Sequence, residues 1–327
     1  MMVDVAVADD SAVAEARRKA AELGAAAGFQ ELRAGQLAIV ATELATNLIK
    51  HGGGGKLLIG AGQAHVDLVA LDRGAGMADV ERCLADGYSS AGTSGNGLGA
   101  VRRMAHRFHV ASWPGRGTAV FARLLRNGAA PDASDLVGAV ETAKAGEVVS
   151  GDAWALHRDA AHCTLFMVDG LGHGSEAALA ANEAVSQFQR SRAEMPADIV
   201  QAVHLAMRHT RGGAVAVARI DFAASTVVYA GLGNIAALLA SPSGQLRRMV
   251  SLNGTAGHNA RKIQAFEYPC GDGLLIMHSD GIGSSWTLQA YPGFVRLHPM
   301  LLAGLLMRDH SRGRDDATVV VARTHAA

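Results

Sequence analysis

The stretch GTSGNGLGAVRRM, residues 92 to 104, holds four glycines in its first eight positions and then turns into a helical pattern. A flexible linker would be polar on both sides and would not lead into a helix. Here the glycines run directly into residues 100–105, where the pattern indicates the start of a helix. A helix N-terminus preceded by glycines can present backbone N–H groups to an anion. The stretch therefore indicates a loop that binds phosphate, and the rest of the chain decides whether that interpretation holds.

Length and composition limit the possible classes of protein. A chain of 327 residues accommodates two domains of about 100–200 residues each. Hydrophobic residues make up 49% and charged residues 18%, and 30 basic residues balance 30 acidic ones. The balance favours neither nucleic acid nor an anionic membrane as partner. We find no secretory signal pattern and no apolar run long enough to span a bilayer.

The cysteines indicate the cellular compartment. Cys83, Cys163 and Cys270 are odd in number and widely spaced, which argues against a disulfide framework and suits a reducing environment. We therefore expect a cytoplasmic protein without nucleic-acid or membrane partners. The oligomeric state stays open.

One composition change divides the chain. RNGAAPDASD, residues 126–135, contains turn formers and no apolar period, and it predicts a linker. We expect domains over residues 1–127 and 136–327, with a linker at 128–135. Grouped helices among runs of strands predict an α+β fold rather than a doubly wound sheet. The expected helices cover residues 11–27, 31–51, 175–189, 197–208 and 299–309 and a segment from the glycine loop to 108. The expected strands cover 56–60, 65–72, 108–112, 118–125, 137–143, 152–157, 163–169, 214–221, 226–231, 236–240, 273–280 and 317–323.

The second helix carries polar residues at a regular spacing. Glu43, Asn47 and His51 recur every four residues and so share one face. A carboxylate and a carboxamide on one line could hold Mg²⁺ and polarise a hydroxyl group or water, although a solvated polar face is the alternative. The next strand pair ends in Asp72, an acceptor followed by glycines that let a flat ring approach. An ordinary turn gives the same pattern.

In order, ATELATNLIKH, DRGAGM and GNGLGAVRRM resemble the GHKL ATPase superfamily over residues 5–125, and within it the RsbT-like switch-protein serine kinases. The resemblance implies a GHKL (Bergerat) α/β sandwich that binds Mg-ATP. It implies that Glu43 is the general base and that Asn47 holds Mg²⁺. It also implies that Asp72 accepts the adenine amino group. The remaining cofactor-binding residues implied by the motifs are Gly74, Gly76 and Thr118 around adenine, and Gly95, Gly97, Leu98 and Gly99 at the phosphates. We expect no phosphoacceptor helix before this domain, and therefore a protein serine or threonine as acceptor.

Acidic residues recur at strand ends or tight turns in the second domain. They stand in Gly151-Asp152, Asp169-Gly170, Asp280-Gly281 and Asp315-Asp316. Hard cations prefer oxygen ligands, and carboxylates at adjacent strand ends can converge on two ions. Each Asp-Gly pair alone is more often a turn, and we interpret Asp272 as one.

FMVDGLGHGSEAALAA (166–181), with VSGDAWAL, YAGLGN, IMHSDGI and RDDATVVVAR, resembles the metal-dependent SpoIIE/RsbX-type serine phosphatases over residues 136–324. The resemblance implies a PPM-type αββα sandwich with a dinuclear Mn²⁺ or Mg²⁺ centre, in which Asp169 and Asp280 are catalytic. The implied metal ligands are Asp152, Asp169, the Gly170 carbonyl, Asp280 and Asp315. Asp316 could instead orient its neighbour, and His173 could cap the next helix or take part in catalysis.

One departure from the phosphatase pattern is visible. Many relatives carry a further acid shortly after the first metal-binding aspartate, where this chain has Ala153-Trp154-Ala155. The departure concerns a third metal position and not the central pair.

Together the two resemblances imply a bifunctional serine kinase and phosphoserine phosphatase. Its expected substrate is a STAS-domain or stressosome-type protein in a sigma-factor or stress-response pathway. One alternative is a nucleotide-dependent binding module, anti-sigma or regulator-clamping, attached to an active phosphatase. Another is an ATPase fused to an inactive phosphatase, which the presence of all four aspartate positions disfavours.

Overall fold

The computed structural model describes residues 1–84, 97–129 and 136–325. It divides into two compact units, residues 2–135 and residues 136–327 together with Met1, and each is described by itself. Within the described residues, no helix is both long enough and apolar enough to cross a bilayer.

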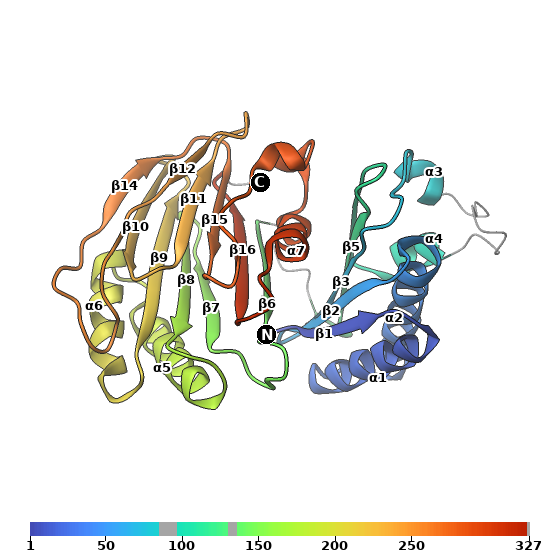
Figure 1. Ribbon diagram of the computed structural model, residues 1–327, viewed down its shortest axis with the longest axis horizontal. Helices are drawn as coiled ribbons and strands as arrows, with labels where there is room; N and C mark the ends of the chain where they lie inside the picture. The colour runs from blue at the N-terminus through green and yellow to red at the C-terminus, as the bar shows by residue number, and fades with distance from the viewer. Residues whose placement is uncertain (85–96, 130–135, 326–327) are drawn as a thin grey trace. The chain divides into compact units, whose positions relative to one another are not determined.

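The first unit is an antiparallel sheet with helices on one face (Figure 1). The strand order is β1-β2-β3-β5-β4. Its elements are β1 (Val3–Val7), α1 (Asp10–Ala26), α2 (Glu31–Gly52), β2 (Gly55–Ala61), β3 (His65–Leu71), α3 (Val80–Leu84), α4 (Gly97–Met104), β4 (Arg107–Ser112) and β5 (Thr118–Leu125).

Local signals explain where the two long helices begin and end. Asp9 caps α1, because its side chain accepts hydrogen bonds from the backbone N–H groups of Ser11 and Ala12. Gly53 ends α2 in the left-handed conformation, with φ of 66°, which glycine adopts without steric cost. The apolar faces of α1, α2 and α4 pack with alternate residues of the strands in one core.

The second unit contains two sheets. One has the order β13-β10-β9-β8-β7 with β14 beside β10, and the other has the order β12-β11-β15-β16-β6. Its strands are β6 (Val137–Thr142), β7 (Asp152–Arg158), β8 (His162–Gly170), β9 (Gly213–Asp221), β10 (Thr226–Leu232), β11 (Ala236–Ala240), β12 (Leu246–Arg248), β13 (Ser251–Leu252), β14 (Phe266–Pro269), β15 (Leu274–His278) and β16 (Ala317–Arg323). Its helices are α5 (Ser175–Ser191), α6 (Pro196–Ala206) and α7 (Pro299–His310), with 3₁₀ turns at Met207–His209, Leu288–Ala290 and Phe294–Arg296.

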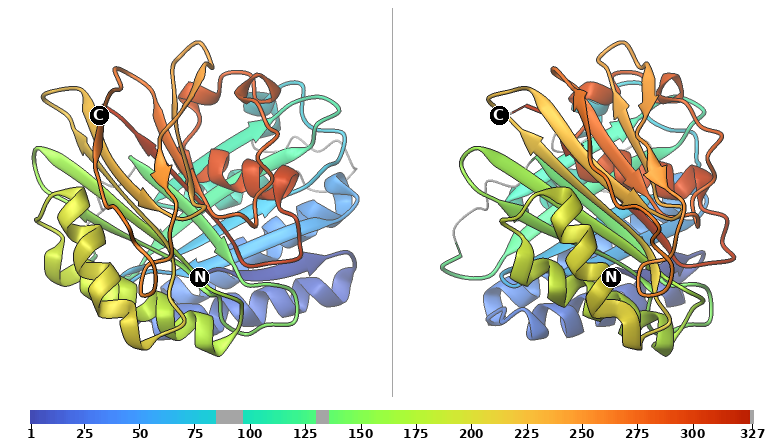
Figure 2. Two further views of the ribbon diagram at one scale, coloured as in Figure 1. Left: turned by 60° about the vertical axis from the view of Figure 1, so that its left-hand side comes forward. Right: turned by 90° about the vertical axis from the view of Figure 1, so that its left-hand side faces the viewer.

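These elements form four layers (Figures 1 and 2). The two sheets enclose one apolar core, and a second core lies between the β7–β10 sheet and helices α5 and α6. Helix α7 packs on β6 and β16 of the other sheet. The α+β class, with a GHKL-like first unit and an αββα second unit, is therefore confirmed.

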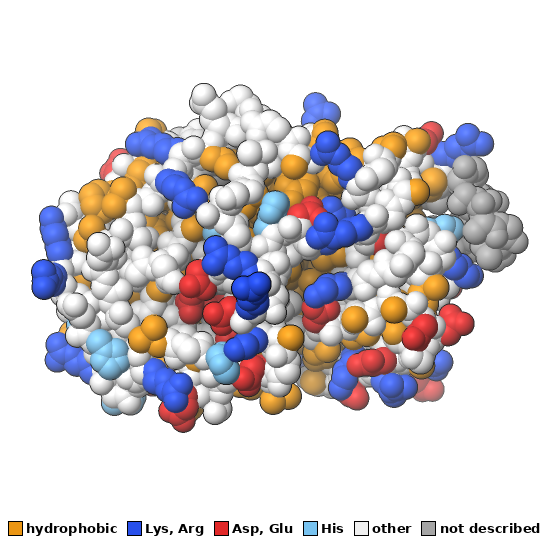
Figure 3. Space-filling view, viewed as in Figure 1, with side chains coloured by type: hydrophobic (Ala, Val, Ile, Leu, Met, Phe, Trp, Pro, Cys, Tyr) orange, Lys and Arg blue, Asp and Glu red, His pale blue; other side chains and the backbone are white. Residues whose placement is uncertain are grey.

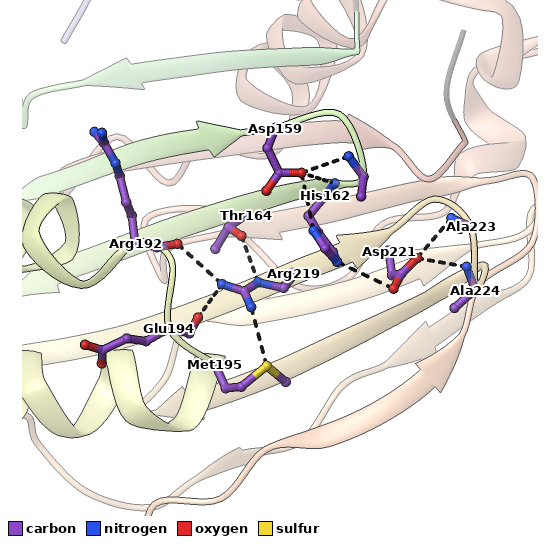
Figure 4. A network of polar contacts seen from close by, with 11 residues as sticks. Asp159, His162, Thr164, Arg192, Glu194, Met195, Arg219, Asp221, Ala223 and Ala224 are labelled. Carbon is purple, nitrogen blue, oxygen red and sulfur yellow. Dashed lines mark hydrogen bonds and ion pairs between the residues drawn. The ribbon is translucent and has the colours of Figure 1, made fainter.

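A polar network joins the far ends of β8 and β9 to the α5–α6 turn (Figure 4). Arg219 donates to the Thr164 hydroxyl at 3.2 Å and to the carbonyl oxygens of Arg192 and Glu194. His162 lies between the carboxylates of Asp159 and Asp221, at 3.3 and 3.6 Å. His162 and Asp169 stand at opposite ends of β8, about 23 Å apart along the strand. The network therefore anchors the α5–α6 turn at the end of the sheet that is far from the predicted metal ligand Asp169.

The expected elements are confirmed, with differences at short or edge segments. Strands β1, β12, β13 and β14 and helix α3 were not predicted. Helix α4 begins at Gly97, inside the glycine-rich stretch rather than at Ala100, and it ends at Met104 rather than at Phe108, which lies in β4.

Candidate nucleotide and metal sites

The polar face of α2 meets the start of α4. Leu44 and Leu48 point into the core, while Glu43 and Asn47 on the neighbouring face are half-buried. A Cβ atom on Gly97 would lie 2.8 Å from Glu43 Oε2 and 3.6 Å from Asn47 Oδ1. A side chain at position 97 would therefore require the Glu43 carboxylate to move. The structure thus brings Glu43, Asn47 and Gly97 together.

The Asn47 side chain has an unused hydrogen-bonding group. Its Nδ2 atom is buried and has no hydrogen-bond partner among the described residues. Buried polar groups are normally paired, so this amide is suited to a bound polar group or ion. Leu98 and Gly99 follow in the first turn of α4, where Leu98 packs against the core and Gly99 is buried.

Asp72 follows β3 beside the C-terminal end of α2. Its Oδ1 atom accepts hydrogen bonds from the backbone N–H groups of Gly74, at 2.8 Å, and Thr118, at 3.1 Å. Close contacts explain the glycines: a Cβ on Gly74 would lie 2.5 Å from the His51 carbonyl oxygen, and one on Gly76 would lie 2.1 Å from that of Trp113.

The β4–β5 hairpin is joined to this loop. The Thr118 and Ser112 hydroxyl groups are 2.9 Å apart, and the Ser112 hydroxyl accepts a hydrogen bond from the Met77 N–H group at 2.7 Å. Of the predicted adenine residues, Asp72, Gly74 and Thr118 thus form one hydrogen-bonded group, and Gly76 packs closely against the Trp113 carbonyl oxygen. It lies at the end of α2, about 14 Å along the helix from Glu43. Gly95 and most of the expected lid, residues 86–99, lie outside the described residues.

In the second unit, two acidic residues face each other on adjacent strands. Asp152, the first residue of β7, pairs directly with Asp169 of β8. Asp152 is only 2% exposed, and its Oδ2 atom has no hydrogen-bond partner among the described residues. Burial, and then the charge of Asp169, raise the pKa of Asp152 well above its usual range.

Acidic residues from the opposite sheet converge on Asp169. Asp280 follows β15 and Asp315 precedes β16, and these two strands pair side by side. Burial, and then the negative charges of Asp280, Asp315 and Asp316, raise the pKa of Asp169 to about 7. The pKa of Asp280 is raised by burial and by Asp315, and lowered by Arg312 and by a 2.8 Å hydrogen bond from Asn234. The predicted acids therefore share one electrostatic environment.

Two glycines let α5 approach this site. A Cβ on Gly170 would lie 2.5 Å from the Ala177 carbonyl oxygen, and one on Gly151 would lie 2.6 Å from the Ala177 Cβ. Gly170 ends β8 and pairs with Gly213 of β9. The glycines of Gly151-Asp152 and Asp169-Gly170 are thus explained by the close packing of α5 and not only by a turn.

The paired acids Asp315 and Asp316 differ in their surroundings. Asp316 is buried, and its two carboxylate oxygens accept hydrogen bonds from the backbone N–H groups of Lys144, at 2.8 Å, and Gly151, at 2.7 Å. Asp315 is exposed and accepts from the N–H group of Asp316. Asp316 therefore holds the chain that leads into Asp152.

The residues fit divalent metal ions. Burial and neighbouring carboxylates raise the pKa of Asp152, Asp169 and Asp280, and the buried Oδ2 atom of Asp152 has no hydrogen-bond partner among the described residues, so a cation would relieve both costs. In the described part of the chain, no group of three Asp, Glu, His or Cys side chains is close enough to hold one ion. Mg²⁺ commonly binds through one or two carboxylates and several waters, so such a group is not required.

Two expectations for single residues are resolved. His173 does not cap α5, because Gly174 is the N-cap residue and no side chain caps it. Instead, His173 Nδ1 lies 2.7 Å from Glu147 Oε1. Asp272 is exposed between β14 and β15, as the turn interpretation predicts.

Sequence reasoning missed several residues around the acids. Glu147, Arg312 and Arg211 stand outside the quoted motifs and carry no signal of their own. Asn234 ends the quoted YAGLGN, and its position after two glycines could have identified it.

Comparisons with known proteins agree with the two-unit description. Residues 6–124 match the histidine kinase-like ATPase domain, and residues 159–286 match stage II sporulation protein E (SpoIIE). The serine/threonine-protein kinase RsbT of Bacillus subtilis (strain 168) is 30% identical over 97 residues, 28% of this chain and 73% of RsbT. The phosphoserine phosphatase RsbX of the same strain is 26% identical over 143 residues, 42% of this chain and 70% of RsbX.

Solved structures resemble the chain over a little more than half its length. A chain from work on the bacterial stressosome, a modular system adapted to control secondary messenger signaling, is 31% identical with a TM-score of 0.54, and the match covers 57% of this chain and 98% of that one. RsbX in complex with magnesium is 21% identical with a TM-score of 0.51, covering 57% and 92%, and shows the fold alone.

The fold and these relatives define a protein that joins a histidine kinase-like ATPase unit to a SpoIIE-like phosphatase unit. Through its first unit the chain belongs to the histidine kinase-like ATPase family that includes RsbT, and part of its second unit matches the SpoIIE family model.

Proposed function

We propose that the chain is a bifunctional enzyme that phosphorylates and dephosphorylates a serine or threonine of one protein partner. Residues 1–127 form the kinase domain, 128–135 the linker and 136–327 the phosphatase domain. The observation that carries the proposal is the convergence of Asp152 and Asp169 with Asp280 and Asp315 from the opposite sheet.

In the phosphatase unit, Asp152, Asp169, Asp280, Asp315 and the Gly170 carbonyl would hold two Mn²⁺ or Mg²⁺ ions. Such ions supply a nucleophile from water at neutral pH and neutralise charge on the phosphoryl group. Asp169 stands between the two sheets and is the natural shared ligand. Asp316 keeps the Asp152 strand in place through its two backbone hydrogen bonds.

In the kinase unit, Asn47 would hold Mg²⁺ and Glu43 would accept the proton of the attacking hydroxyl group. Asp72, Gly74, Gly76 and Thr118 would bind adenine, and Gly97, Leu98 and Gly99 would place backbone N–H groups on the phosphates. Phosphoryl transfer depends mainly on positioning and charge neutralisation. The contact of Gly97 with Glu43 and Asn47 supports this arrangement, because it joins the phosphate loop to the base and the metal ligand.

The relatives support a proposal for the substrate class. RsbT is a serine/threonine-protein kinase and RsbX a phosphoserine phosphatase, and one chain that joins both kinds of unit is suited to set the phosphorylation state of a single partner. We propose a STAS-domain or stressosome-type protein in the cytoplasm. A flexible linker of about eight residues has a root-mean-square reach of about 14–17 Å, which would keep a bound partner at high effective concentration.

The deciding experiment incubates the full chain with ATP, Mn²⁺ and the STAS proteins encoded nearby, with mass spectrometry as readout. We expect phosphate on one serine or threonine and its removal after ATP is depleted. A Glu43→Ala variant separates the binding-module alternative, because a module that never transfers phosphate is unchanged by it. No phosphorylation of any STAS protein by the wild-type chain would contradict the kinase half.

A second comparison tests whether the two activities communicate. Phosphatase rates on one phosphorylated STAS partner are measured with ADP, with a non-hydrolysable ATP analogue and without nucleotide. We expect the rate to depend on the nucleotide, because simultaneous activities would cycle ATP without effect. Identical rates in all three conditions would leave the domains merely tethered.

A further inference from the structure

The acidic site poses an electrostatic problem for its substrate. This step rests on the proposed phosphatase activity. A phosphomonoester dianion must approach several carboxylates, and a cationic side chain beside the bound ions would make that approach less costly. Arg312 lies close enough to lower the pKa of Asp280, so its charge already interacts with that carboxylate. A second arginine, Arg211, lies near Gly172, which follows the proposed ligands Asp169 and Gly170.

Arg211 lies over the loop that directly follows Asp169 and Gly170. The ladder between β8 and β9 ends at the pair Gly170 and Gly213, and Leu171 N–H donates to the Gly212 carbonyl oxygen at 2.9 Å just beyond it. A Cβ on Gly172 would lie 3.4 Å from Arg211 Nη1. The guanidinium group therefore contacts the turn next to the proposed metal ligands.

The backbone at Arg211 is held firmly although its side chain is exposed. The Thr210 hydroxyl accepts from the Gly212 N–H group at 3.0 Å and donates to the Met207 carbonyl oxygen at 2.7 Å. His258 Nε2 donates to the Arg211 carbonyl oxygen at 2.9 Å.

The guanidinium group itself is not used in an ion pair. Within the described residues, Arg211 forms no salt bridge, whereas Arg123 and Arg308 do. The backbone of a solvated surface arginine does not need to be held by hydrogen bonds in this way. The side chain of a structural arginine would have a carboxylate or carbonyl partner.

We propose that Arg211 binds the phosphoryl oxygens of the phosphorylated protein substrate. Its planar fork matches two phosphate oxygens at once, which a lysine cannot do. The role is substrate binding and not proton transfer, since arginine stays protonated. The predicted ligand class is a phosphomonoester dianion carried by a protein serine or threonine.

The test compares the full-length wild type with Arg211→Ala, Arg211→Lys and Arg190→Ala in the presence of Mg²⁺. Arg190 is the matched control, because it stands near the C-terminal end of α5, about 22 Å along that helix from its first residue. Two quantities are measured: hydrolysis of a phosphoserine peptide, and binding of inorganic phosphate by calorimetry. Loss of a charged hydrogen bond corresponds to a tenfold to hundredfold change.

We expect Arg211→Ala to raise KM and weaken phosphate binding by about tenfold or more, with partial recovery in Arg211→Lys and no change in Arg190→Ala. Equal phosphate affinity in wild type and Arg211→Ala would overturn the proposal, as would an absence of phosphate binding to the wild type. If the wild type binds phosphate but hydrolyses no phosphoserine, the phosphatase function fails, and the effect of Arg211→Ala on binding still decides the role of Arg211.

Discussion

Asp152 and Asp169 stand directly opposite each other on β7 and β8, with one of them almost wholly buried. Two carboxylates in such a position cannot both be charged without cost, and both have raised pKa values. Figure 3 shows acidic side chains gathered near β7, with Lys and Arg side chains beside them. Without bound cations, these buried and closely spaced carboxylates therefore lower the stability of the fold, and cations would restore it.

The first prediction concerns pH and metal removal. Burial and then the neighbouring carboxylates raise the pKa of Asp169 from its ordinary value of 3.8 to about 7 in the folded chain, so between these values the folded chain binds more protons than the unfolded chain. The stability of the metal-free protein therefore falls as pH rises through that range. The stabilising contribution of protonated Asp169 is fully present only below its pKa in the unfolded chain, and it is lost as pH rises through the folded pKa. Urea denaturation in EDTA at several pH values measures the slope.

The control for this prediction is Asp169→Asn, which carries no titrating carboxyl group and should lack that part of the slope. Addition of Mn²⁺ favours the charged carboxylates, so stabilisation by metal should grow with pH. A metal-free stability that rises with pH between about 4 and 7 equally in both proteins would contradict the assignment.

The second prediction concerns the phosphatase reaction. Asp169→Ala should reduce Mn²⁺-dependent hydrolysis of an aryl phosphate more than any other single aspartate change, because Asp169 lies among the acids of both sheets. Asp272→Ala should have little effect, because Asp272 is exposed in the bend between β14 and β15. Steady-state rates with chelator as blank measure both, and equal losses would show that the ligands are misassigned.

The third prediction concerns nucleotide binding. Asp72→Asn should weaken Mg-ATP binding by about tenfold to hundredfold, because the adenine amino group would meet an amide that can donate. The variant should fold, since its amide oxygen can still accept from Gly74 and Thr118. Glu43→Ala should bind ATP nearly normally and lose transfer. Calorimetry on the full chain measures affinity, and unchanged affinity in Asp72→Asn would rule out the adenine assignment.

The fourth prediction concerns the contact between α4 and α2. Gly97→Ala would place a Cβ 2.8 Å from Glu43 Oε2 and should displace that carboxylate, so phosphoryl transfer falls strongly while the fold persists. Gly35→Ala is the matched control, because it lies in α2 with nothing within 4 Å of the added Cβ. It should raise helix stability by about 0.5–1 kcal/mol. Thermal unfolding and transfer assays separate the two, and full transfer in Gly97→Ala would disprove the contact.

Much of the architecture was readable from the chain by itself. Periodicity located the long helices and the two-sided apolar strands, because burial of a helix stripe or a strand needs apolar residues at fixed spacings. Motif order then identified both families, because ordered motifs are far more specific than any one of them. Short edge strands such as Ser251–Leu252 escaped prediction, since two residues carry no period and their pairing depends on distant partners.

Tertiary structure decided what the individual polar residues do. Asp315 and Asp316 are identical neighbours in sequence, yet one is exposed at the site and the other is buried under two backbone N–H groups. Likewise, Arg211 and Gly172 are far apart in the chain. They meet only because the last residue of β8 pairs with the first residue of β9. Spacing along a chain determines which residues share a helix or strand face, whereas charge, burial and contact depend on which elements the fold packs against one another.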